Sequence, residues 1–137
     1  MNTPGEGEVR ISAELDIVTV RQEVRQASVA LGFRPTDVTR IVTAASELAR
    51  NVFLYAGTGT MRWRALSVDG NTGIELVFTD SGPGIGDVEQ ALVPGYTTGR
   101  GLGMGLPGAK RLMGEMDIQT ALGSGTTVTV RKWQGRW

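Results

Sequence analysis

The stretch RGLGMGLPGAKRLMGEM, residues 100–116, decides how the fold is read, because three closely spaced glycines lead into a helical pattern. The glycines stand at positions 101, 103 and 105, and apolar residues then recur at helical spacing as far as Met116. Pro107 fits a first helical turn, whose N–H groups have no partners within the helix. Such N–H groups attract anions, phosphate above all. The stretch predicts a phosphate-binding loop and a helix, although a flexible loop before an ordinary amphipathic helix fits the same residues.

The composition narrows the class of protein and of chemistry. A chain of 137 residues with 40% hydrophobic content suits one well-cored domain, which we expect over residues 8–137, behind a loose tail at 1–7. Lys plus Arg equals Asp plus Glu at 14 each, so we expect neither nucleic acid nor a membrane as partner. The chain has no Cys and no His, which leaves carboxylates for acid–base chemistry. Without an apolar run of about 18 residues, we expect a cytoplasmic protein.

The hydrophobic pattern predicts an α+β fold. Alternation of apolar and polar residues indicates strands, and steps of three and four indicate helices. We expect Asp16 to be the N-cap of the first helix. The resulting fold class is a two-layer α/β sandwich, a mainly antiparallel sheet with helices on one face. The expected strands cover 9–13, 61–65, 74–79, 117–120 and 126–133, and the expected helices cover 17–31, 38–55 and 106–116.

Two further features carry candidate chemistry. On the second predicted helix, Glu47 and Asn51 lie one turn apart at the edge of the apolar stripe, so a carboxylate and an amide oxygen can face one point. Asp80 follows an apolar strand and precedes Gly82 and Gly84, where the backbone can approach a flat ligand. Residues 86–100 lack periodicity and predict a lid between the two glycine motifs. A solvated helix flank and a tight turn are the structural alternatives.

Taken together, ELARN at 47–51, DSGPG at 80–84 and GLGMG at 101–105 resemble the three nucleotide-binding boxes of the GHKL ATPase superfamily. Members of this superfamily include DNA gyrase B, Hsp90, histidine kinases and MutL. The resemblance covers nearly the whole chain. It implies the Bergerat ATP-binding fold, with ATP and Mg²⁺ bound under a lid.

The resemblance also implies a role for each matching residue. Glu47 would be the catalytic base that takes the proton from the attacking hydroxyl, and Asn51 would be the Mg²⁺ ligand. Asp80 would accept the adenine amino N–H, supported by Thr126. Arg100 and Lys110 would contact phosphate, or they are ordinary exposed basic residues. The remaining residues expected to line the nucleotide site are Gly82, Gly84, Ile85, Gly101, Gly103, Met104 and Gly105.

Within the superfamily, the length and the phrases ELARNVFLYAG and GLGMGLPGAKRLM are similar to small bacterial serine/threonine kinases of partner-switching modules. That resemblance implies phosphorylation of a STAS-domain protein, either an anti-sigma antagonist or a stressosome scaffold. The kinase is then released to activate the regulator domain of a PP2C-type phosphatase.

Three alternatives and the oligomeric state stay open. The first alternative is an anti-sigma kinase that sequesters a sigma factor. The second is a nucleotide-dependent binding module with little turnover, against which an intact Glu47 argues. The third is a detached histidine-kinase catalytic domain, which the absence of histidine disfavours. Whether the chain forms a homodimer is not decided by the sequence.

Overall fold

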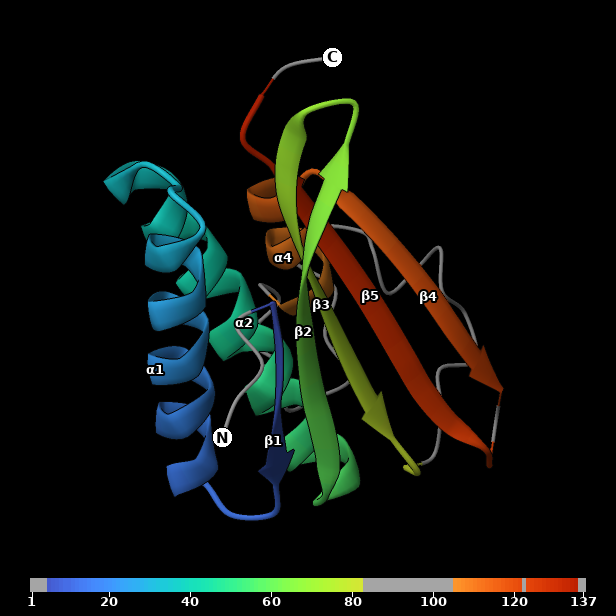
Figure 1. Cartoon of the computed structure of the whole chain (residues 1–137). Helices are drawn as coiled ribbons and strands as arrows, with labels where there is room; N and C mark the ends of the chain where they lie inside the picture. Colours follow the sequence, from blue (N-terminus) through green and yellow to red (C-terminus); the bar gives the residue numbers. More distant parts are fainter. Residues whose placement is uncertain (1–4, 83–104, 122, 136–137) are drawn as a thin grey trace.

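Five strands form one antiparallel sheet, and the helices lie against one of its faces (Figure 1). This is a computed structural model, and it describes residues 5–82, 105–121 and 123–135. The strand order is β1-β2-β3-β5-β4. The strands are β1 (Glu6–Ile11), β2 (Gly59–Val68), β3 (Asn71–Asp80), β4 (Glu115–Ala121) and β5 (Gly125–Trp133), and the helices are α1 (Leu15–Ala30), α2 (Pro35–Ala56) and α4 (Gly105–Met113). The predicted two-layer α/β sandwich is therefore confirmed.

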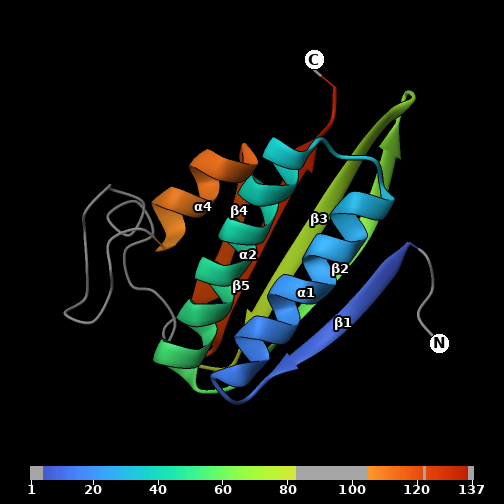
Figure 2. The ribbon, with the colours of Figure 1, turned by 90° about the vertical axis from the view of Figure 1, so that its left-hand side faces the viewer.

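The core lies between the sheet and the helices, as the alternation in the strands predicts. Phe78 and Leu76 of β3 lie in register with Val128 and Val130 of β5, and all four side chains are buried. The buried stripe of α2, which runs from Val38 to Val52, covers this face (Figure 2). Ridges of apolar side chains from both layers thus exclude water.

Two side-chain hydrogen bonds also connect the sheet to α1. Trp63 of β2 donates its indole N–H to Glu23 of α1 at 3.0 Å. Gln134 donates its side-chain N–H to the backbone carbonyl of Leu31 at 2.6 Å, which connects the end of the sheet to the end of α1.

Among the described residues, the helices are too short or too polar to span a membrane.

One helix end and one strand start differ from the sequence-based expectation. The third helix ends at Met113 rather than Met116, because Gly114 adopts a φ of 98°, which breaks helical geometry. Met116 lies instead in β4, paired with Val130. The strand β1 begins at Glu6, inside the range expected to be the tail, because Glu6 pairs with Arg64.

The prediction that Asp16 is the N-cap of α1 is wrong, since the helix begins at Leu15 and Glu14 is its N-cap. The Asp16 carboxylate reaches backward instead and accepts the backbone N–H groups of Ser12 and Ala13 at 2.9 and 3.0 Å. These hydrogen bonds, the one from Ser12 first, lower the pKa of Asp16. The carboxylate therefore braces the turn between β1 and α1.

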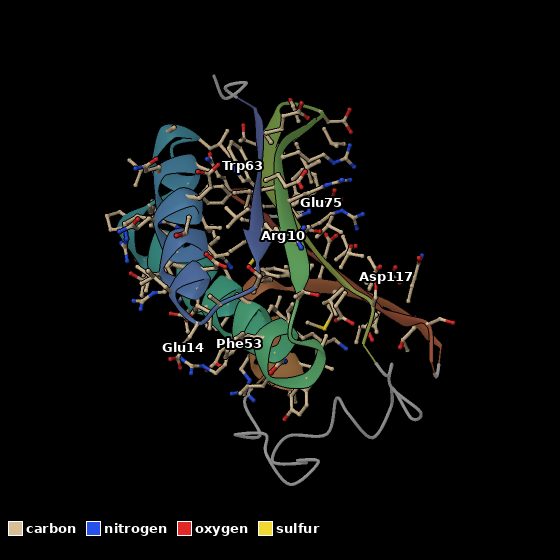
Figure 3. The ribbon with its side chains drawn as sticks, turned by 90° about the horizontal axis from the view of Figure 1, so that it is seen from below. Arg10, Glu14, Phe53, Trp63, Glu75 and Asp117 are labelled. Atoms are coloured by element: carbon tan, nitrogen blue, oxygen red, sulfur yellow. The ribbon has the colours of Figure 1, made fainter. Side chains whose placement is uncertain are left out.

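The other face of the sheet is polar and carries a charge network (Figure 3). Glu75 of β3 is 5% exposed and accepts Nε–H from both Arg64 and Arg131, each at 2.7 Å. Burial raises the pKa of Glu75, but the hydrogen bonds from the two arginines outweigh it and the pKa is lowered. The network thereby connects β2, β3 and β5 on the side away from the helices.

Candidate functional site

Glu47 and Asn51 occupy successive turns of α2, and both side chains are half-buried. The helix geometry that the sequence predicts therefore holds, with Leu48 and Val52 buried on the adjoining stripe. Neither the Glu47 carboxylate nor the Asn51 amide has a hydrogen-bond partner among the described residues. Two half-buried polar groups on one edge of a helix are thus available to a ligand.

The N-terminus of α4 lies directly against Asn51. A Cβ atom built on Gly105, the first residue of α4, would come within 2.5 Å of Asn51 Nδ2 and 3.0 Å of Asn51 Oδ1. Gly108 and Ala109 are buried on the side of α4 that packs against α2. Because the first N–H groups of a helix lack intrahelical partners, the Asn51 amide lies beside donors suited to an anion.

Asp80 ends β3 on the helix side of the sheet. Its Oδ1 accepts the backbone N–H of Gly82 at 2.9 Å, which fixes the carboxylate at the start of the following loop. Gly82 and Gly59 carry no side chains, so the segments around Asp80 can pack closely. A Cβ on Gly82 would come within 2.7 Å of Ala56 Cβ at the end of α2, and one on Gly59 would come within 3.3 Å of Asp80 Cβ. The half-buried Asp80 carboxylate keeps acceptor capacity for a further donor.

Thr126 lies beside Asp80 on the neighbouring strand β5. It is the register partner of Asp80 in the pairing of β3 with β5, and its hydroxyl lies 2.9 Å from that of Thr120. Thr120 in turn donates its hydroxyl to the carbonyl of Gly125 at 3.0 Å. Gly125 has a φ of 87°, and a Cβ there would collide with the carbonyl of Asp80. The glycine therefore permits the close pairing that holds Asp80 and Thr126 together.

Not every predicted site residue takes part in this arrangement. Lys110 is exposed in the last turn of α4, away from the helix start, and has no ion pair within the described ranges. The lid at 86–100 and six of the predicted residues lie outside the described residues: Gly84, Ile85, Arg100, Gly101, Gly103 and Met104.

Sequence reasoning missed several residues that shape the site. The sequence pattern gives Ala56, Gly59 and Thr120 no role at the site. The contacts of Ala56 with Gly82 and of Gly59 with Asp80 join separate elements, so no local pattern reveals them. Thr120 and Thr126 lie only six positions apart, but their contact depends on the register of β4 with β5. The one available signal was small size, since Ala56 and Gly59 flank the end of α2 where the Asp80 loop must approach.

The side chains at this site suit a magnesium ion whose ligands are mostly substrate oxygens. No cluster of three or more Asp or Glu side chains that could cage a metal occurs among the described residues. Mg²⁺ in phosphoryl-transfer sites keeps waters and phosphate oxygens and takes only one or two protein oxygens. The half-buried amide of Asn51, beside the start of α4, can supply one such oxygen.

The start of α4 beside the half-buried Asn51 amide, and the Asp80 carboxylate at the end of β3, are groups from which a nucleotide site can be built. The family of histidine kinase-like ATPase domains matches residues 11–132, and this chain belongs to that family.

Relatives from two protein classes are similar to most of the chain. The serine/threonine-protein kinase RsbT of Bacillus subtilis is 45% identical over 125 residues, which cover 91% of this chain and 94% of that protein. An anti-sigma F factor of Caldanaerobacter subterraneus is 34% identical over 118 residues, which cover 80% of this chain and 81% of that protein. The similarity to RsbT is therefore both higher and more extensive.

Solved structures agree on the fold. The mycobacterial sensor histidine kinase MprB superposes with a TM-score of 0.57 at 19% identity, covering 96% of this chain and 99% of that one. A blue-light-activated histidine kinase from Erythrobacter litoralis gives a TM-score of 0.53 at 18% identity, covering 87% of this chain and 59% of that one. At such identities the comparison speaks for the fold alone.

Proposed function

We propose that this protein is an ATP-dependent serine/threonine kinase of a bacterial partner-switching module. The observation that carries the proposal is the contact of Asn51 with the start of α4, with Glu47 one helical turn before Asn51 on α2. The similarity to a named serine/threonine-protein kinase over 91% of the chain supports the same activity.

In the proposed reaction, each residue either positions the nucleotide or neutralises charge on it. Asn51 holds Mg²⁺ through its amide oxygen, and the N–H groups at the start of α4 bind phosphate oxygens. Asp80 accepts the amino N–H of adenine with the oxygen that Gly82 leaves open. When bound, Mg²⁺ would neutralise the negative charge that develops on the phosphate groups. The protein's contribution is thus mainly pre-organisation.

Glu47 is the proposed general base. A serine or threonine hydroxyl of the substrate protein attacks the γ-phosphorus of ATP, a new O–P bond forms, and the bond to the β-phosphate oxygen breaks to release ADP. The hydroxyl proton passes to the Glu47 carboxylate. A chain without histidine leaves this role to a carboxylate, and Glu47 lies one turn from Asn51.

The proposed substrate is a STAS-domain protein, an anti-sigma antagonist or a stressosome scaffold, and the released kinase then activates a PP2C-type phosphatase. The similarity to an anti-sigma F factor favours a second candidate, a kinase that sequesters a sigma factor. We rank this candidate second because the identity to the anti-sigma F factor is lower, 34% against 45%. Location in the cytoplasm and the formation of a homodimer stay predictions.

Single-turnover phosphotransfer from ATP to a purified STAS-domain protein tests the proposal. We expect Glu47→Gln to lower the rate by about 10²–10⁴ while ATP affinity changes only slightly, because the amide keeps the shape but takes no proton. Glu14→Gln, an exposed carboxylate of the same charge outside the site, is the matched control and keeps the wild-type rate. A wild-type rate for Glu47→Gln would exclude Glu47 as the base.

Calorimetric titration with Mg²⁺-ATP tests binding separately from transfer. We expect Asn51→Ala and Asp80→Ala each to weaken binding by about 5-fold or more, since each loss leaves a ligand group unpaired at about 1–3 kcal/mol. Gln26→Ala, on the exposed face of α1, is the control. Equal affinity for the wild type and both site variants would contradict the assignment.

A further inference from the structure

Three polar side chains lie in one row across the end of the sheet. Asp80 of β3 is the register partner of Thr126 of β5, and Thr126 is in turn the register partner of Thr120 of β4. The three strands are neighbours in this order (Figure 1). All three residues are half-buried. The row therefore extends the proposed adenine end of the nucleotide site beyond Asp80, as far as β4.

The alternation of the strands places the three side chains on the face that the helices cover. Two positions away along the same strands, Phe78, Val128 and Ile118 pack in the core between the sheet and the helices. Residues two positions apart on a strand share a face. Opposed residues on neighbouring strands have Cβ atoms about 4.5–5.5 Å apart. Polar side chains in such a row are close enough to interact.

The hydrogen bonds of Thr120 decide which way the Thr126 hydroxyl points. Thr120 donates its hydroxyl to the backbone carbonyl of Gly125 at 3.0 Å. A hydroxyl has one proton, and a carbonyl has none to offer. In the 2.9 Å contact between the two threonine hydroxyls, Thr126 is therefore the donor and Thr120 the acceptor. The Thr126 hydroxyl then offers only its lone pairs to any other group.

We infer that Thr120 is a positioning residue of the nucleotide site, because it holds the Thr126 hydroxyl as an acceptor toward the base. This inference rests on the proposed function, in which Asp80 accepts the amino N–H of adenine. The ionised Asp80 carboxylate has no proton to donate, and one of its oxygens already accepts from Gly82. Asp80 and Thr126 thus both present acceptors. They suit a base with an amino group and disfavour a base with a keto oxygen in its place.

Loss of the Thr120 hydroxyl removes this constraint. The Thr126 hydroxyl proton is then free to turn toward a keto oxygen of the base. It can also turn toward the Asp80 carboxylate, where it competes with the amino group for the same acceptor. Both changes reduce the discrimination between an amino and a keto base. Thr120→Val makes this change with little effect on shape, because valine keeps the branched side chain and lacks only the hydroxyl.

Titration with ATP and with inosine triphosphate tests this role. Inosine triphosphate has a keto oxygen where ATP has the amino group, so the ratio of the two Kd values, measured by calorimetry with Mg²⁺, reports the hydrogen-bond direction. We expect Thr120→Val to lower the preference for ATP by about 5-fold or more, the effect of one mismatched hydrogen bond. Thr120→Ser retains the hydroxyl and should keep the wild-type ratio. Thr127→Val is the matched control, because Thr127 is half-buried on the other face of β5.

A double-mutant cycle shows whether Thr120 acts through Thr126. If it does, adding Thr120→Val to Thr126→Val should change the ratio no further. Partial unfolding weakens the binding of both nucleotides equally and leaves the ratio unchanged.

Two results would overturn this inference alone. They are a wild-type ratio for Thr120→Val, and equal losses for Thr120→Val and Thr120→Ser. A wild-type protein that binds neither nucleotide, or that does not prefer ATP, would overturn the proposed adenine contact and this inference with it.

Discussion

Gly105 and Asn51 are in contact across the interface between α4 and α2, with no room for a methyl group between them. The absence of a side chain at the first residue of α4 is what allows the helix start to lie on the Asn51 amide. This contact couples two segments that are separated by more than fifty positions in the chain and that both belong to the proposed nucleotide site.

The first prediction concerns this contact. Gly105→Ala should displace either the Asn51 side chain or the start of α4, because the added Cβ would lie 2.5 Å from Asn51 Nδ2. We expect Mg²⁺-ATP affinity to fall about 5-fold or more, in line with an overpacking cost of about 1–3 kcal/mol. Gly5→Ala is the control, because its nearest neighbour would be Ala65 Cβ at an ordinary 3.9 Å. Unchanged calorimetric affinity for Gly105→Ala would show that the contact does not position the ligand.

The second prediction concerns the opposite end of α4. Lys132 of β5 donates its ammonium N–H to the carbonyl of Leu112 at 2.9 Å, one of the last carbonyls of the helix. Lys132→Met should lower the free energy of unfolding by about 1–2 kcal/mol, since it removes a charged donor at a helix C-terminus. ATP affinity should fall as well, because α4 carries Gly105. Urea denaturation and calorimetry measure the two effects, and a variant as stable as the wild type would refute the capping role.

The third prediction is a pH dependence at Glu75. Because the folded-state pKa of Glu75 lies below its ordinary 4.5, its stabilising contribution is present above that value and is lost as the pH falls below it. At about pH 7, Glu75→Gln should lower the free energy of unfolding by about 1–3 kcal/mol, the cost of weakened hydrogen bonds to Arg64 and Arg131. Near pH 3 the difference from the wild type should shrink.

Glu8→Gln is the matched control for Glu75. It belongs to the same sheet face, but its ion pair with Arg62 is exposed on both sides, at 51% and 68%. Such pairs contribute about 0–1 kcal/mol. Denaturation curves in which Glu75→Gln and Glu8→Gln have the same effect at every pH would exclude a special role for the buried carboxylate.

Much of the fold could be predicted from the sequence alone, because periodicity is a local property. Alternation identified the strands around Met61 and Ile74, and steps of three and four identified α1 and α2. One turn of helix between Glu47 and Asn51 likewise follows from their spacing. The stop of α4 at Met113 was missed, because Gly114 can either continue a helix or end it, and only its φ of 98° decides.

Contacts between distant segments were decided by the tertiary structure. The position of Gly105 on Asn51, of Gly82 on Ala56 and of Asp80 beside Thr126 depends on how α2, α4 and the sheet pack. A single sequence does not show which residues from distant segments lie close together in the fold. The exposure of Leu15 and Val29 could not be predicted either, since both are apolar residues like those of the core. Whether an apolar residue faces the core or the solvent is settled only when the whole layer is assembled and its other face is left uncovered.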